Sequence, residues 1–220
     1  MSRIARIVAP GLPHHVTQRG NRRAQIFFTD EDYLTYLARL KYDTERWGLS
    51  ILAYCLMPNH MHHVSVPLTA EALGFAIRDT HTAYAVYRHH LDATSGHVLQ
   101  GRFYSCVLDE PHLWAAIRYV ERNPVRAGLV TIASDYHWSS AAAHCSLRTD
   151  PLLTPLPNQQ EAVLDWEAWL SAEDEQTDTL LRQQTHTGRP LGSQKFLEEL
   201  EANLNRSVIP KKRGPKPNHT

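Results

Sequence analysis

The sequence predicts an α+β fold of the split βαβ, ferredoxin-like type, in which an antiparallel sheet carries helices packed on one face. The main support is the predicted order of elements, which is β-α-β-β-α-β. Apolar runs of strand length alternate with amphipathic runs of helix length, and turn residues separate them. The chain contains no internal repeat.

Each element is predicted from its apolar spacing and from the residues that start or stop it. Acidic residues at 30–32 begin the first helix, and Gly48 ends it. Pro58 and Asn59 form a turn between two buried strands, and the last helix ends before Pro124 because the residue preceding a proline disfavours helical backbone. The predicted strands cover residues 12–18, 50–56, 60–66 and 103–107, and the predicted helices cover residues 30–47, 69–90 and 111–122.

The sequence changes character after residue 150. Pro151, Pro155 and Pro157 mark a linker, and residues 159–172 and 193–205 are predicted to form two further helices. Residues 211–217 form a basic tail interrupted by proline and glycine. We therefore divide the chain into a main domain, residues 1–150, and a helical extension with a flexible basic tail, residues 151–220.

Composition excludes several classes of protein. The apolar fraction of 42% is sufficient for a core, and no window approaches the roughly 18 consecutive apolar residues of a membrane helix. Cys55, Cys106 and Cys145 are odd in number and widely separated, which argues against a disulfide scaffold or a cysteine-type zinc module. We expect a cytoplasmic protein that has no membrane partner.

The formal net charge of zero conceals a segregation of charge. Five basic residues and no acid lie in 1–23, five basic residues and no acid lie in 206–220, and seven acids and no base lie in 161–178. Basic ends around an acidic segment favour a polyanionic partner whose phosphates the ends contact. A solvated surface with a flexible tail is the alternative that the charges leave open.

His60 and His62 form the most informative pair in the chain. On a strand, residues two apart point to the same face, so the two imidazoles are expected side by side and able to share one metal ion. His63 points to the opposite face, where we expect a core histidine with a local partner. By itself His-x-His is a weak motif, because strand histidines also serve as ordinary hydrogen-bonding residues; His14 and His15 are best explained in that way.

A second cluster lies at the end of the helix predicted over 111–122. Tyr119 and Asn123 are four residues apart and so share a helix face. A phenol and an amide oxygen beside a histidine-bound divalent cation suit phosphodiester transfer: the phenolate attacks phosphorus and the metal polarises a phosphate oxygen. Oxygen from Asn123 favours a hard ion, Mg²⁺ or Mn²⁺. Taken alone, Tyr119 is better explained as an ordinary tyrosine at the edge of the core, and the histidine pair is what favours the nucleophile.

Five motifs that occur in order carry a resemblance to a known family. They are residues 11–21, residues 53–62 with His60 and His62, residues 100–103, residues 118–130 with Tyr119 and Asn123, and residues 135–140. Together they resemble the REP-associated tyrosine transposases, a branch of the single-tyrosine HUH transposases of the IS200-like type, over about residues 10–140.

The resemblance implies a fold, an activity and site residues. Residues 1–150 would be an HUH tyrosine transposase or nuclease domain, a metal-dependent endonuclease and strand transferase acting on single-stranded DNA at hairpins of repeated extragenic palindromes. His60 and His62 match the metal ligands, Tyr119 the nucleophile that becomes joined to a 5′ phosphate, and Asn123 the polar residue that assists the metal. Where the family usually has an aliphatic residue after the histidine pair, this chain has His63.

DNA contacts are predicted from charge, amides and one aromatic ring. Phe103 is equally consistent with stacking on an unpaired base and with ordinary core packing. The predicted DNA-binding residues are Arg19, Asn21, Arg22, Arg23, Gln100, Arg102, Phe103, Arg118, Arg122 and Arg126.

The preferred prediction is thus an HUH single-tyrosine enzyme that nicks and joins single-stranded, hairpin-forming DNA in the bacterial cytoplasm, near the nucleoid, as a monomer or homodimer. One alternative is a catalytically silent module that binds single strands or hairpins on the same fold. A second alternative is a metal-dependent hydrolase that uses water in place of Tyr119. The sequence leaves open the target sequence, the metal used in the cell, and transposition versus maintenance of repeats.

Overall fold

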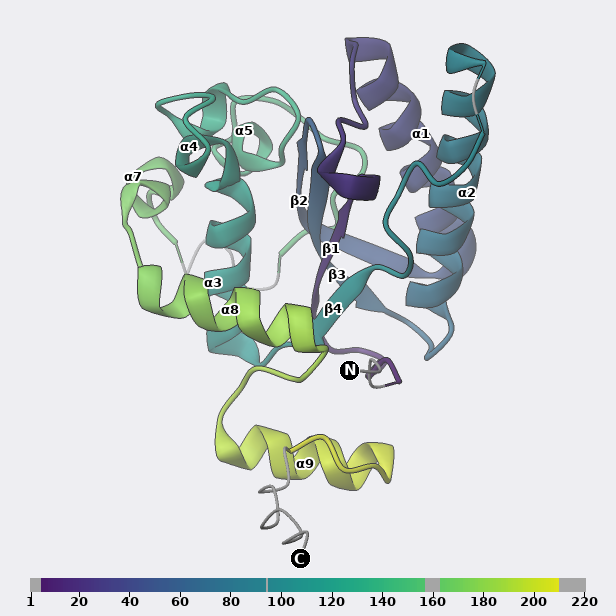
Figure 1. The fold of residues 1–220 in the computed structure, drawn as a ribbon. Coiled ribbons are helices and arrows are strands. Elements are labelled where there is room, and N and C mark those ends of the chain that lie inside the picture. Colours follow the sequence, from purple (N-terminus) through teal and green to yellow (C-terminus); the bar gives the residue numbers. More distant parts are fainter. Residues whose placement is uncertain (1–4, 94, 157–162, 210–220) are drawn as a thin grey trace, which may run out of the picture.

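The computed structural model describes residues 5–93, 95–156 and 163–209. At its centre lies a four-stranded antiparallel sheet with the strand order β2-β3-β1-β4 (Figure 1). This is the order of a split βαβ sheet, so the predicted fold class is confirmed. The strands are β1 (His14–Arg19), β2 (Leu49–Met57), β3 (His60–Pro67) and β4 (Tyr104–Val107).

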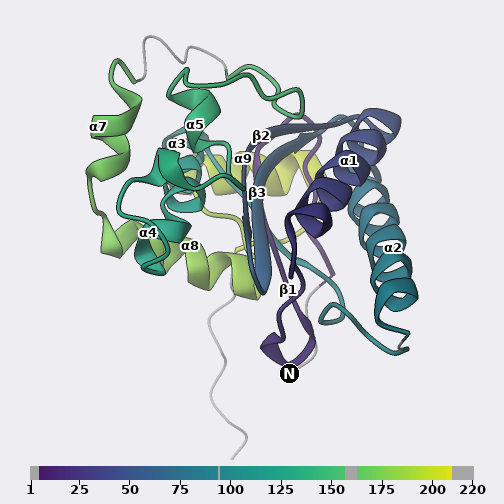
Figure 2. The ribbon, with the colours of Figure 1, turned by 90° about the horizontal axis from the view of Figure 1, so that it is seen from above.

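Helices cover both faces of the sheet, so the molecule has three layers (Figure 2). Helices α1 (Asp30–Trp47) and α2 (Ala72–Asp92) pack on one face, as the fold class predicts. Helix α3 (Glu110–Glu121) packs on the other face, and α8 (Glu175–Thr187) lies against β4 and α3 on that side. The sequence predicted helices on one face only, whereas α3 and α8 also cover the second face.

The two faces of β3 carry different residues because side chains alternate along a strand. Met61 lies in the core under α1 and α2, where the Tyr36 hydroxyl donates to its Sδ atom at 2.9 Å. His63 points to that same face and is buried, as predicted, but its Nδ1 has no hydrogen-bond partner in the described part of the chain. His60 and His62 consequently point to the α3 side.

Helix α1 shows that local sequence determines its two ends. Thr29 and Asp32 form a capping box at its start, and Gly48 ends it with φ of 69°, a left-handed conformation that favours glycine. Tyr36, Leu40 and Ile77 of α1 and α2 are at most 1% exposed, and complete burial of each aliphatic side chain contributes about 1.5–3 kcal/mol. This apolar layer holds the sheet from one side.

The remaining described elements are short, apart from α9. The predicted helix over 193–205 is α9, whereas of the acidic helix predicted over 159–172 the structure has α7 only; residues 157–162 and the basic tail beyond 209 lie outside the described residues. The elements are η1 (Asn21–Arg23), α4 (Asn123–Arg126), η2 (Ala133–Asp135), α5 (Ala141–His144), α7 (Trp166–Ser171) and α9 (Gln194–Leu204).

A buried carboxylate ties the end of α3 to the segments that follow it. Glu121 is fully buried and accepts hydrogen bonds from the Ser140 hydroxyl, from His144 Nδ1 at 2.6 Å and from Trp166 Nε1 at 2.8 Å. A buried charge is tolerated only when it is paired and hydrogen-bonded, so this network fixes the residues next to Tyr119.

The half-buried His81 on α2 predicts a loss of stability in mild acid. Its desolvation lowers its pKa to about 3, whereas an unfolded histidine titrates near about 6.5. Below that pH the unfolded chain binds the extra proton, so the contribution of this histidine is fully present above about pH 6.5 and falls by up to about 1.4 kcal/mol per pH unit as the pH drops toward the folded pKa.

We therefore expect the free energy of unfolding of a His81→Gln variant to depend less steeply on pH than that of the wild type, measured by urea denaturation between about pH 7.5 and 5. Replacement of the exposed His97 by glutamine is the matched control and should leave the slope unchanged. Equal slopes for His81→Gln and the wild type would contradict the prediction.

Candidate active site

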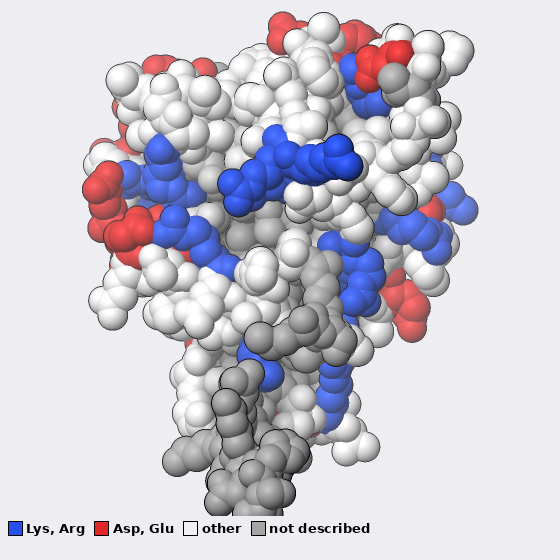
Figure 3. Space-filling model, in the orientation of Figure 1, with Lys and Arg blue, Asp and Glu red and all other residues white. Residues whose placement is uncertain are grey.

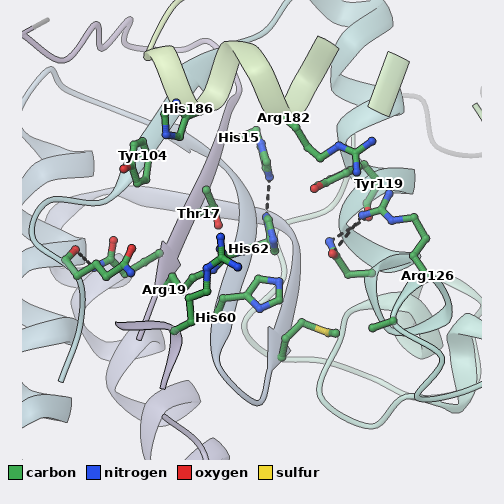
Figure 4. Close-up of a pocket in the computed structure, with 16 residues that line it drawn as sticks. His15, Thr17, Arg19, His60, His62, Tyr104, Tyr119, Arg126, Arg182 and His186 are labelled. Atoms are coloured by element: carbon green, nitrogen blue, oxygen red, sulfur yellow. Dashed lines mark hydrogen bonds between the residues drawn. The ribbon is translucent and has the colours of Figure 1, made fainter. Parts of the chain in front are cut away.

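A cavity of about 590 Å³ opens between the sheet, α3–α4 and α8. His60, His62, Tyr119 and Asn123 all line it, so the structure brings together the four residues predicted for metal binding and nucleophilic attack (Figure 4). The two histidines come from β3, Tyr119 from α3 and Asn123 from α4.

Each of the two histidines is held in place by a hydrogen bond at its Nδ1 atom. Their ring centroids are 5.0 Å apart with an interplanar angle of 80°. The Nδ1 atom of His60 lies 2.7 Å from Asn59 Oδ1, and that of His62 lies 3.0 Å from His15 Nε2. Within the described chain neither Nε2 atom has a hydrogen-bond partner, so each can offer a lone pair to a metal ion.

Burial keeps both imidazoles neutral, which is the form that binds metal. It lowers the pKa of His60 to about 4, with a further contribution from the charges of Arg19 and Arg126. Burial also lowers the pKa of His62 well below its usual value, and the neighbouring His15 and His60 add to the effect.

Asn123 can provide a third ligand atom for a metal ion. Among the described residues no group of three histidine, cysteine, aspartate or glutamate side chains could hold a metal ion. Asn123 donates from Nδ2 to the Tyr119 carbonyl at 3.2 Å, and its Oδ1 accepts from Arg126 Nη2 at 3.1 Å. An amide oxygen has two lone pairs, so one remains. Two imidazole nitrogens and one amide oxygen fit a divalent ion that keeps water or substrate in its other positions.

Tyr119 lies beside the histidines in a basic environment. Its side chain is 5% exposed, its ring centroid is 5.6 Å from that of His62, and the Arg126 guanidinium lies 3.8 Å from the ring centroid. Burial raises the pKa of the phenol, whereas the charges of Arg126 and Arg182 oppose that rise. The phenol is therefore protonated at neutral pH, with cationic groups close to the place where a phenolate would form.

Three of the predicted DNA-binding arginines contact the acidic segment of this chain. Among these contacts, Arg118 pairs with Asp174 at 3.5 Å, and Arg126 pairs with Asp178 at 2.5 Å. Arg122 is buried and pairs with Glu173 at 2.9 Å. In Figure 3 acidic side chains lie beside basic ones at the left edge of the face. As DNA contacts these three residues stay predictions, and a phosphate would have to compete with carboxylates for them.

The other predicted DNA-binding residues lie around the cavity opening and around η1. Arg19, Arg23 and Gln100 line the cavity, and Asn21 and Arg22 line a separate groove of about 340 Å³ beside α2. The side chains of Arg22 and Arg23 are exposed and have no acidic partner in the described part of the chain.

The last two predicted DNA-binding residues, Arg102 and Phe103, line neither this cavity nor that groove. Arg102 is exposed on the loop before β4. Phe103 is 9% exposed and packs in the core with the Arg6 guanidinium 3.5 Å from its ring centroid. The structure thus places Phe103 in the core, the second of the two roles that the sequence left open.

Sequence reasoning did not find α8, which supplies Arg182 and His186 to the cavity wall. Local evidence for the helix exists: Asp174 caps its start by accepting from the Thr177 amide, and Gly188 ends it with φ of 74°. Apolar periodicity is weak, however, because the helix buries only Leu181 and Thr185. The contact between α8 and the site is long-range and has no local sequence pattern.

The described residues include no helix long and apolar enough to cross a membrane. No protein-family model matches the chain, and no curated protein matches it. Several chains of solved structures are similar to it. One, a REP-associated tyrosine transposase bound to a REP hairpin, is 18% identical with a TM-score of 0.57, and the match covers 71% of this chain and 99% of that chain.

The second solved structure is a Deinococcus radiodurans R1 protein assigned provisionally as a transposase. It is 19% identical with a TM-score of 0.37, over 56% of this chain and 97% of that chain. At these identities the comparison with the hairpin-bound transposase establishes the fold, and it agrees with the family resemblance carried by the motifs.

Proposed function

We propose that this protein is a metal-dependent, single-stranded DNA endonuclease and strand transferase of the REP-associated tyrosine transposase type. The observation that carries the proposal is the meeting of His60, His62 and Tyr119 in one cavity although they come from different elements. A module that only binds nucleic acid has no need of two neutral imidazoles facing a tyrosine flanked by arginines. The similarity to a hairpin-bound transposase supports the same class of function.

In the proposed reaction the Tyr119 phenol loses its proton and its oxygen attacks the phosphorus of a phosphodiester. A bond forms between the Tyr119 phenolic oxygen and the phosphorus, which remains as the 5′ phosphate of the downstream strand. The bond from phosphorus to the 3′ oxygen of the upstream strand breaks, and this oxygen takes up a proton and leaves as a 3′ hydroxyl. A divalent ion held by His60, His62 and Asn123 would polarise a non-bridging phosphate oxygen. Arg126 would stabilise the negative charge beside Tyr119.

The covalent intermediate allows joining as well as cleavage. A phosphotyrosine retains the energy of the phosphodiester bond, so attack by a 3′ hydroxyl reverses the step and releases Tyr119 without ATP. We propose hairpin-forming single-stranded DNA as the partner, with Arg19, Arg22 and Arg23 contacting phosphates. Mg²⁺ or Mn²⁺ is the proposed metal because Asn123 offers oxygen.

Trapping of the covalent intermediate tests the identity of the nucleophile. Wild-type protein mixed with labelled hairpin DNA from the repeats of its own genome and with Mn²⁺ should form a protein–DNA adduct that resists denaturation and is absent with EDTA. Tyr119→Phe should form none, because the phenolic oxygen is the group that bonds to phosphorus. The measurement is a denaturing gel with the DNA labelled at one end or the other. The 3′ label should stay with the protein, because Tyr119 is joined to the 5′ phosphate of that fragment, and the 5′-labelled fragment should be released with a free 3′ hydroxyl.

Two other tyrosines sharpen the test. Tyr42 is exposed on α1, away from the cavity, so Tyr42→Phe should form the adduct as the wild type does. Tyr104 on β4 also lines the cavity, and loss of the adduct only in Tyr104→Phe would show that the nucleophile is Tyr104 and not Tyr119. Cleavage without an adduct that persists in Tyr119→Phe would favour water as nucleophile, and tight binding without any product would favour the binding module.

The salt dependence of hairpin binding tests the proposed phosphate contacts of η1. Arg22→Gln and Arg23→Gln should each weaken hairpin binding and reduce the slope of log affinity against log salt by about 0.7–0.9, the value for one lost phosphate contact. Arg78→Gln on α2 is the control, because Arg78 already pairs with Asp79 on the far face. Fluorescence anisotropy at several salt concentrations measures both quantities, and unchanged slopes in both variants would exclude these arginines as phosphate contacts.

A further inference from the structure

A chain of buried hydrogen bonds links the extension to His62. On α8 the Thr185 hydroxyl lies 2.7 Å from His15 Nδ1. On the other side of the same ring, His15 Nε2 lies 3.0 Å from His62 Nδ1 (Figure 4). At the far end Thr185 is also 3.2 Å from Cys106 Sγ. Thr185 and His15 are each 1% exposed and His62 is 6% exposed, so solvent does not substitute for these partners.

The direction of the hydrogen bonds follows from what a metal ligand needs. For His62 Nε2 to offer its lone pair, the ring proton must sit on Nδ1, which then donates to His15 Nε2. The His15 proton must accordingly sit on Nδ1, and it donates to the Thr185 oxygen. The Thr185 hydroxyl in turn donates to Cys106 Sγ. Each atom has one role, and the chain is complete.

Loss of the Thr185 hydroxyl would favour the opposite arrangement. A buried N–H without an acceptor is less well tolerated than a buried lone pair without a donor. Without the hydroxyl, His15 would therefore carry its proton on Nε2 and donate it to His62 Nδ1. His62 would then carry its own proton on Nε2, the atom that has to face the metal.

We propose that Thr185 and His15 are positioning residues that hold His62 in its metal-binding tautomer, so that α8 of the extension is a working part of the metal site. The inference rests on the proposed function in one respect, the assignment of His62 as a metal ligand. It extends that function to His15 and to Thr185, which lies outside the motifs. Thr185 belongs to a helix that Leu181 in the core and the Asp178–Arg126 ion pair hold against α3–α4.

Metal binding without DNA tests this inference independently of catalysis. Titration of the full chain with Mn²⁺, by calorimetry or electron paramagnetic resonance, should give an affinity about 10–100-fold lower for Thr185→Val, the usual effect of losing such a partner. Thr185→Ser keeps the hydroxyl and should bind within about threefold of the wild type. His62→Ala should lose binding, and melting curves show that each variant is folded.

A spectroscopic measurement separates positioning from packing. In metal-free wild-type protein, ¹⁵N-detected imidazole correlations should show His62 protonated on Nδ1, and Thr185→Val should shift it toward Nε2. Wild-type affinity and an unchanged tautomer in Thr185→Val, with binding lost in His62→Ala, would overturn this inference and leave the proposed metal site intact. Equal losses in Thr185→Val and Thr185→Ser would also overturn it. Wild-type affinity in His62→Ala would overturn the proposed metal site, and this inference with it.

Discussion

The alternation of side chains along β3, held in register by β1, is the constraint on which the site depends. Thr17 pairs with His62 and Arg19 pairs with His60 across the two strands. A slip of one residue would move both histidines into the core under α1 and α2, and would put Met61 into the cavity. Met61 is 1% exposed and accepts from Tyr36. The apolar packing on one face therefore determines which residues face the cavity on the other.

Buried polar contacts, as well as the apolar packing of α3, fix the position of Tyr119. Glu121, two residues further along α3, is fully buried and satisfied by three donors from α5, from α7 and from the turn before α5. Loss of one hydrogen bond to a charged group costs about 1.5–3 kcal/mol, so the end of α3 has little freedom to shift. The site thus combines a sheet fixed by packing with a helix fixed by buried hydrogen bonds.

The parts of this design that sequence could predict are the local ones. The separation of two between His60 and His62 and of four between Tyr119 and Asn123 gave their shared faces, and Gly48 gave the end of α1. Contacts between distant segments could not be predicted from the sequence. Thr185 and His15 are 170 residues apart, and Arg126 and Asp178 are 52 apart, so neither pair leaves a periodic pattern in the sequence. The predicted boundary at residue 150 is likewise a matter of chain composition, whereas α8 contacts the core of the main domain.

Charge illustrates the same difference between local and long-range information. In the sequence the acidic segment was part of a charge pattern that favoured a polyanionic partner, with a solvated surface as the alternative. In the structure its residues Glu173, Asp174 and Asp178 pair with arginines of α3 and α4. Among the described residues that line the cavity, Arg19 and Arg23 are therefore the arginines without an acidic partner. Because an ion pair with an exposed carboxylate contributes little net free energy, and Glu173 is 84% exposed, a phosphate could replace that carboxylate at small cost. Asp178, at 14% exposed, is harder to displace, so the charge of Arg126 beside Tyr119 is compensated from within the chain.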